Sequence, residues 1–131
     1  MADIFPETEL WPTCAPARAI ARSAAAEMHS SFSALRSNMP MNTRRSAPGE
    51  GNANAADVDK DIRRVCEVWD ECRAEAERRG LLDGPFLFGS FTAVDAMFAP
   101  GTYNKRLEAH TRNCSFVMYH FFLTCAVDRE S

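Results

Sequence analysis

Apolar residues recur at alternating steps of four and three over a long stretch in the middle of the chain, which is the spacing of one face of an α-helix. The stretch covers about residues 55–79, and its stripe is formed by Val58, Ile62, Val65, Trp69, Cys72 and Ala76. Aspartates in its first turns and arginines in its last turn suit the helix dipole, and Gly80 is suited to end it. A helix with this stripe must pack against other elements, so it limits the folds open to the chain.

A second amphipathic stretch precedes it, from about Pro16 to Asn38, and predicts one continuous helix that Pro40 ends. Its stripe again follows helical spacing. The apolar positions are Ile20, Ala24, Met28, Phe32, Leu35 and Met39. Between the two helices, residues of about 40–56 are polar and rich in Gly and Pro, which predicts a mobile loop.

A third helix is predicted to start at Thr92, where Thr92 and Asp95 have the spacing of a capping box. In that motif the hydroxyl accepts from the N–H of Asp95, and the carboxylate accepts from the N–H of Thr92. Phe91 is expected to act as the hydrophobic staple against Ala96. Pro100 and the following glycine stop or kink this helix.

The two ends of the chain have a different character. Residues 1–15 contain two prolines and predict a linker, although Leu10 and Trp11 are apolar enough to dock on a surface. The tail, residues 101–131, could contain a further helix, but residues 116–123 are rich in strand-forming side chains, so a strand is the alternative there. Together the segments predict an all-α fold, a small bundle in which the first two long helices are antiparallel and the third is buried between them.

Composition excludes several classes of function. The 131 residues fit one domain, and the formal net charge of −3 gives no general attraction to nucleic acid. The longest apolar run is too short to span a bilayer, and the first residues do not form a secretory signal, so we expect a cytoplasmic protein with no membrane partner. The five cysteines form no CxxC pair, which predicts free thiols and no metal site. They are Cys14, Cys66, Cys72, Cys114 and Cys125.

Three blocks, in this order, resemble the C-terminal helical domain of bacterial glutathione transferases. Residues 5–12 are similar to the linker that leads into that domain, and residues 22–32 to its first helix. The second block contains the run Glu-hydrophobic-His-x-x-Phe, which is closest to the beta class. Residues 84–100 are similar to the turn and buried helix that carry the capping box of the family. The resemblance implies a domain over residues 16–100, followed by a divergent tail.

The same resemblance implies roles for individual residues, with glutathione as co-substrate. His29 would face the active-site cleft and touch the thiol end of glutathione, and Arg22 matches a position that reaches glutathione in the partner subunit. Met28 and Phe32 would line the hydrophobic co-substrate pocket, and Arg36 would pair with a carboxylate of glutathione. Each role has a structural alternative: a solvated helix histidine, ordinary core packing for the apolar pair, and solvated charges for the arginines.

The resemblance implies a glutathione transferase, in which glutathione is conjugated to electrophiles, with this chain forming the wall of the co-substrate site. The thioredoxin-like domain that grips glutathione comes earlier in that family, and we expect it to be missing here, so the isolated chain should have little or no activity. The implied partners are a second copy, in a homodimer, or a separate thioredoxin-like domain. The alternative is a non-catalytic helical interaction module or a truncated remnant.

Overall fold

The computed structural model describes residues 8–38 and 55–102. Four helices lie in these ranges: α1 (Ala15–Ser30), α2 (Ser33–Asn38), α3 (Ala55–Arg78) and α4 (Ala93–Thr102). The described part has no strands, only two isolated β-bridges in the loop before α4, and it forms a small all-α bundle, as predicted. The expectations for the first seven residues, for most of the polar loop and for the tail lie outside the described residues.

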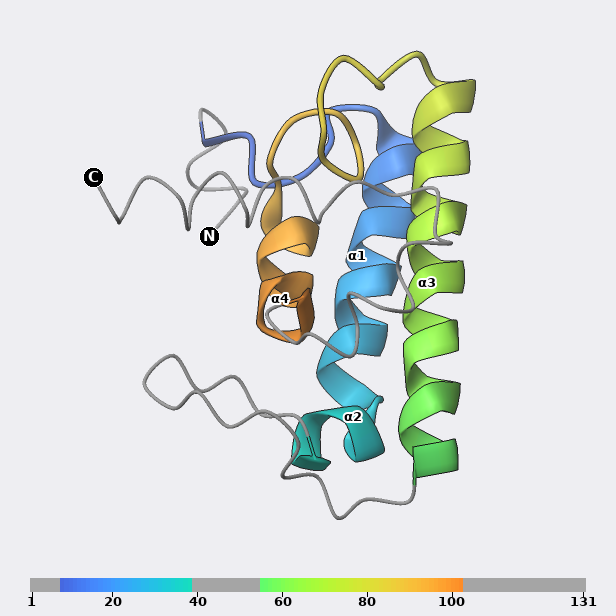
Figure 1. Ribbon diagram of the computed structural model, residues 1–131. Helices are drawn as coiled ribbons and strands as arrows, with labels where there is room; N and C mark the ends of the chain where they lie inside the picture. Colours follow the sequence, from blue (N-terminus) through green and yellow to red (C-terminus); the bar gives the residue numbers. More distant parts are fainter. Residues whose placement is uncertain (1–7, 39–54, 103–131) are drawn as a thin grey trace, which may run out of the picture.

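The long helices α1 and α3 lie side by side and run in opposite directions, as expected (Figure 1). The short helix α2 continues below α1 and packs on the start of α3, while α4 packs on α1. The ring of Phe98 on α4 meets Trp69 on α3 edge to face, with 5.8 Å between ring centroids. Trp69, at 1% exposure, therefore joins α3 to α4, while α1 contacts both.

The predicted stripe of α3 is the centre of the core. Each of its six residues is at most 2% exposed, which confirms the helix and the face that it buries. The core is completed by four alanines of α1, which let the helices approach closely, by Met28 and Phe32 near the end of α1, and by large side chains of α2, α4 and the loop before α4. These are Ala17, Ala21, Ala24, Ala25, Met28, Phe32, Leu35, Leu87, Phe88, Val94 and Phe98.

The prediction of one helix over residues 16–38 is wrong at its centre. The helix ends at Ser30, Phe32 has a backbone φ of 60°, and a new helix begins at Ser33. The change of direction lets Phe32 and Leu35 remain buried, at 4% and 2% exposure, against the first turns of α3. Tertiary packing therefore overrides the local helical pattern at this point.

The loop before α4 has a fixed shape. Gly89 has a φ of 84°, and a Cβ at this position would collide with the carbonyl oxygen of Leu81, so only glycine fits. Arg73 of α3 donates from Nη1 to the carbonyl of Phe86 at 2.6 Å. The predicted staple is wrong, because Phe91 is 52% exposed and its ring meets Phe86, at 5.2 Å between centroids. Ala96, the expected partner, is itself exposed.

The segment before α1 docks on the bundle. Trp11 is half-buried against the core, as its apolar character suggested, and the amide of Ala93 donates to the carbonyl of Leu10 at 2.8 Å. Residues from the start of the described chain therefore contact the first turn of α4. The end of α4, at Thr102, lies one residue beyond the predicted proline–glycine stop.

Candidate functional site

Two of the predicted site residues meet where α1 ends. His29 lies in the last turn of α1 and is exposed, and Arg36 lies on α2. The Nη1 atom of Arg36 donates to the backbone carbonyl of His29 at 2.6 Å, so it satisfies a carbonyl that the end of a helix leaves without an intrahelical partner. The structure therefore ties the exposed Arg36 to the backbone of the exposed His29.

The two predicted pocket-wall residues lie in the core instead of on an open surface. Met28 is 7% exposed and Phe32 is 4% exposed. Their positions match the core-packing alternative, since both belong to the hydrophobic core.

Arg22 is exposed and takes part in a different contact. Its guanidinium carbon lies 5.7 Å from the centroid of the Trp11 ring, which is a cation–π distance. Arg18, one turn earlier, donates to the carbonyl of Thr13 at 3.2 Å. These arginines hold the segment before α1 against the helix, and Arg22 is not brought to His29 and Arg36.

The predicted capping pair at the start of α4 is present and deeply buried. Asp95 is 1% exposed, and its Oδ2 accepts from the amide of Thr92 at 2.8 Å, as the motif requires. The hydroxyl of Thr92 differs from the expectation, because it donates to the same carboxylate oxygen at 2.9 Å. The other oxygen, Oδ1, accepts from the amide of Leu87 at 3.0 Å, so Asp95 also fixes the loop. Burial raises the pKa of Asp95, although these hydrogen bonds act in the opposite direction.

A groove between α1 and α3, with a volume of about 480 Å³, was not predicted from the sequence. Apolar and small side chains form part of it, and charged side chains of both signs form the rest. The lining residues are Ile20, Ser23, Ala24, Glu27, Arg64, Val68, Glu71, Cys72, Ala74 and Arg78. Cys72 is fully buried, and burial raises the pKa of its thiol to about 12, so it is protonated at neutral pH and does not act as a nucleophile.

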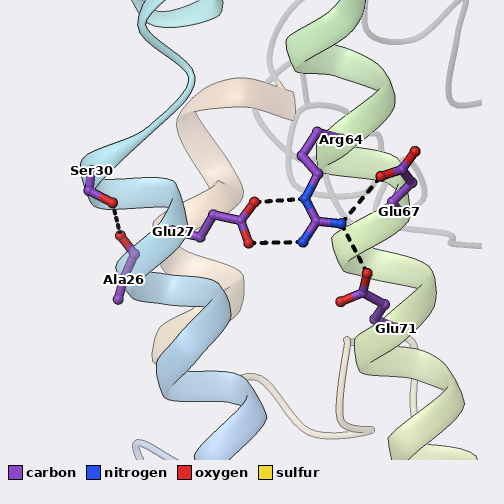
Figure 2. Close-up of polar contacts among 6 residues, drawn as sticks. All are labelled: Ala26, Glu27, Ser30, Arg64, Glu67 and Glu71. Atoms are coloured by element: carbon purple, nitrogen blue, oxygen red, sulfur yellow. Dashed lines mark hydrogen bonds and ion pairs between the residues drawn. The ribbon is translucent and has the colours of Figure 1, made fainter.

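An ion-pair network joins the two sides of this groove (Figure 2). Arg64 of α3 binds both carboxylate oxygens of Glu27 on α1, with Nε to Oε1 at 2.8 Å and Nη2 to Oε2 at 3.1 Å. Its Nη1 also reaches Glu67 at 3.2 Å and Glu71 at 3.0 Å on its own helix. The hydrogen bond to Glu27 is the main reason that the pKa of Arg64 is raised. The spacing of the partners on α3 is visible in the sequence, whereas the pairing with Glu27 is not.

A second network lies at the end of α3. Glu75 is 4% exposed and pairs with Arg79, Nε to Oε1 at 2.9 Å, and with Arg78, Nη2 to Oε2 at 2.5 Å. The hydrogen bond from Arg79 is the largest cause of a lowered pKa at Glu75, so this carboxylate stays ionised. Both arginines lie in the turn that ends the helix, where positive charge also suits the helix dipole.

Within residues 8–38 and 55–102, no group of three or more His, Cys, Asp or Glu side chains could hold a metal ion.

Cys14 and Cys72 are free, but Cys66 is disulfide-bonded, so the prediction of free thiols is wrong at that position. Cys66 is partly buried on α3, whereas Cys72 is fully buried. None of the described helices is both long enough and apolar enough to cross a membrane.

Comparison with known proteins gives neither a family nor a function for the arrangement described above. No family model, no curated protein and no solved structure matches the chain.

Proposed function

We propose that this chain is the helical domain of a cytoplasmic glutathione transferase-like protein, in which the end of α1 borders the glutathione cleft. The capping pair carries this proposal. The resemblance of residues 84–100 implies a buried helix that starts with a capping box, and Asp95 caps α4 from a position that is 1% exposed. The same carboxylate holds the preceding loop through Leu87, which adds support for a helix whose start is structurally central.

The end of α1 has the chemistry that the proposal requires. His29 is exposed, so its imidazole can donate a hydrogen bond to a thiolate or to a polar atom of a bound molecule. Arg36 is also exposed and is tied to the backbone of His29, so a fixed positive charge lies beside the histidine. Glutathione carries a thiol and two carboxylates, and this pair of side chains can attract both kinds of group.

Conjugation needs two things: a glutathione thiol with a lowered pKa and an electrophile held close to it. In the proposed division of work, a thioredoxin-like domain supplies the first. The helical domain contributes a wall of the cleft and the polar contact from His29. We therefore expect the isolated chain to conjugate a generic aromatic electrophile at or near the uncatalysed rate.

Calorimetric titration of glutathione into the purified chain tests the proposal. Binding with a Kd in the millimolar range or tighter, weakened by His29→Ala, is the expected result. Glu77→Ala is the matched control, since it also truncates an exposed helical side chain but lies near the far end of α3. If no heat of binding is observed, or if both variants weaken binding equally, the proposed role of His29 is wrong.

The second candidate is a non-catalytic helical interaction module, and the groove between α1 and α3 favours it. The groove offers small apolar side chains bordered by Glu27, Arg64 and Arg78, which is a mixed surface of the kind that binds protein partners. The burial of Met28 and Phe32 points the same way, because neither side chain is open to a small apolar co-substrate. Under this candidate, His29→Ala has no effect on any binding that the groove supports.

A further inference from the structure

The helix is interrupted between α1 and α2, although the helical spacing of its apolar residues continues through the interruption. Apolar residues recur at helical spacing straight through it, at Ala24, Met28, Phe32 and Leu35. Neither glycine nor proline occurs between Ala17 and Asn38, so neither of the two strongest helix breakers accounts for the bend. The local sequence therefore favours a continuous helix, and something else must hold the bend.

The bend places its central residue in an unfavourable conformation. Phe32 has a φ of 60°, in the left-handed region that an aromatic residue rarely adopts. It also stands at the position just before α2, where Ser, Thr, Asp or Asn normally accepts a hydrogen bond from the first free amides. A phenylalanine side chain has no acceptor, so the first turn of α2 cannot be capped locally.

Asp61 of α3 supplies the missing acceptor. Its Oδ2 accepts from the amide of Leu35, the third residue of α2, at 2.9 Å. The opposite end of the break is held as well, because Arg36 donates to the carbonyl of His29 at 2.6 Å. Ser30 donates from its hydroxyl to the carbonyl of Ala26 at 2.9 Å, a contact that often accompanies helix bending (Figure 2).

A straight alternative would match the length of α3, although it would give up the burial of Phe32 and Leu35 against the first turns of α3, so it is the minor state. A continuous helix from Ala15 to Asn38 would have the length of α3, which is 24 residues, and α1 already lies antiparallel to α3. In such a helix the amide of Leu35 would donate to the carbonyl of Ser31, so it would no longer need Asp61. Phe32 would also leave its left-handed conformation.

We propose that residues 31–33 form a two-state joint, in which Asp61 holds the bent arrangement of α1 and α2 and its release lets residues 15–38 straighten into one helix. Asp61 can bias the joint because its hydrogen bond to Leu35 exists in the bent state alone, whereas the intrahelical bonds across residues 31–35 exist in the straight state alone. The inference concerns the fold of the chain and does not depend on the proposed transferase role.

The Cα chemical shifts of residues 31–33, measured by NMR on the full chain, distinguish the two states. Asp61→Ala removes the acceptor, and the expected result is a shift of these resonances toward helical values, with a roughly fivefold gain in the ratio of straight to bent chains. Asp70→Ala, an exposed aspartate on the same helix, is the matched control and should leave the resonances unchanged. Unchanged resonances in Asp61→Ala, or random-coil values over residues 33–38, would overturn the proposal.

Ala34→Pro provides the complementary test. Residue 34 is the second residue of α2, the position that Pro16 occupies in α1, so proline is compatible with the bent state there. In a straight helix it would lie in the interior, where proline removes a hydrogen bond and clashes with the preceding turn. Adding Ala34→Pro to Asp61→Ala should therefore abolish the helical shift.

The wild-type chain gives a result even if Asp61→Ala does not fold. Relaxation dispersion at residues 31–35 of the wild type should detect exchange with the minor straight state, and Ala34→Pro alone should remove that exchange. A wild type without exchange at these residues, or exchange that persists with proline at position 34, would contradict a two-state joint.

Discussion

Asp95 and Asp61 each accept a hydrogen bond from a backbone amide at the start of a helix, but Asp95 belongs to the helix that it caps, whereas Asp61 belongs to another helix. Asp95 lies three residues after Thr92 and caps the helix to which it belongs, at 1% exposure and with three hydrogen bonds. Asp61 lies 26 residues after Leu35 on another helix, is half-buried, and accepts a hydrogen bond from the amide of Leu35 in the helix that it caps. The first cap is a property of a local sequence, and the second is a property of the packed bundle.

The difference explains which parts of the fold the sequence could predict. The Thr92–Asp95 spacing marks the start of α4 without any knowledge of the tertiary structure, and the stripe of α3 likewise defines its buried face. The break at Phe32 depends on a carboxylate that only the docking of α3 brings to Leu35, so the local pattern predicted one helix. A hydrogen bond between residues far apart in the sequence, such as that between Asp61 and Leu35, produces no recognisable sequence pattern around either residue.

The candidate site also combines residues that could be identified from the sequence with contacts that could not. His29 and Arg36 could be singled out from the sequence, but their mutual contact requires the bend. The groove between α1 and α3 could not be predicted, because Glu27 and Arg64 are 37 residues apart and meet only when the two helices pack. Met28 and Phe32 followed a helical stripe, and that pattern does not distinguish a core face from the wall of a pocket.

Loss of the local, buried cap should have the largest effect. Asp95→Ala leaves the amides of Thr92 and Leu87 buried without their acceptor, and we expect it to lower the free energy of unfolding by about 3 kcal/mol. Urea unfolding followed by circular dichroism measures this change. Asp95→Asn keeps an acceptor and should cost less. A loss below about 0.5 kcal/mol for Asp95→Ala, the level of an ordinary surface change, would show that the cap is unimportant.

The burial of Asp95 also gives its contribution a definite dependence on pH. Its folded-state pKa is raised above the unfolded value of about 3.9, so its protonation favours the native state; this contribution is fully present below the unfolded pKa and is lost as pH rises through the folded pKa. Relative to Asp95→Asn, the wild type should therefore gain stability as the pH falls from 7 toward 4. Urea unfolding of both proteins across this range tests the sign, and a wild type that loses stability relative to the variant would contradict it.

Loss of the distant cap should have a smaller effect. Asp61→Ala removes one hydrogen bond at a half-buried position, and the chain can recover the amide of Leu35 in a straight helix, so we expect a loss of about 1 kcal/mol. Asp70→Ala should change the stability by less than about 0.5 kcal/mol. If Asp61→Ala were as damaging as Asp95→Ala, the distinction between the two caps would fail.

The smallest effect is expected at the surface, where a third carboxylate joins two helices. Glu27→Gln removes the charge that binds Arg64, but the side chains of the pair are 31% and 39% exposed, so solvent screens the interaction. We expect a loss of about 0.5 kcal/mol that shrinks as salt is added. Thermal unfolding at low and high salt measures it, and a loss that does not depend on salt would show that the network acts through packing instead.

The central claim is that the end of α1, and not the groove between α1 and α3, is the functional part of this chain. The most direct measurement is an NMR titration of the isotope-labelled chain with glutathione, in which each backbone amide reports on its own surroundings. Our account predicts that the shifts change most at His29 and Arg36 and saturate at millimolar glutathione or below. Changes confined to groove residues such as Glu27, Arg64 and Arg78, or no changes at all, would contradict it.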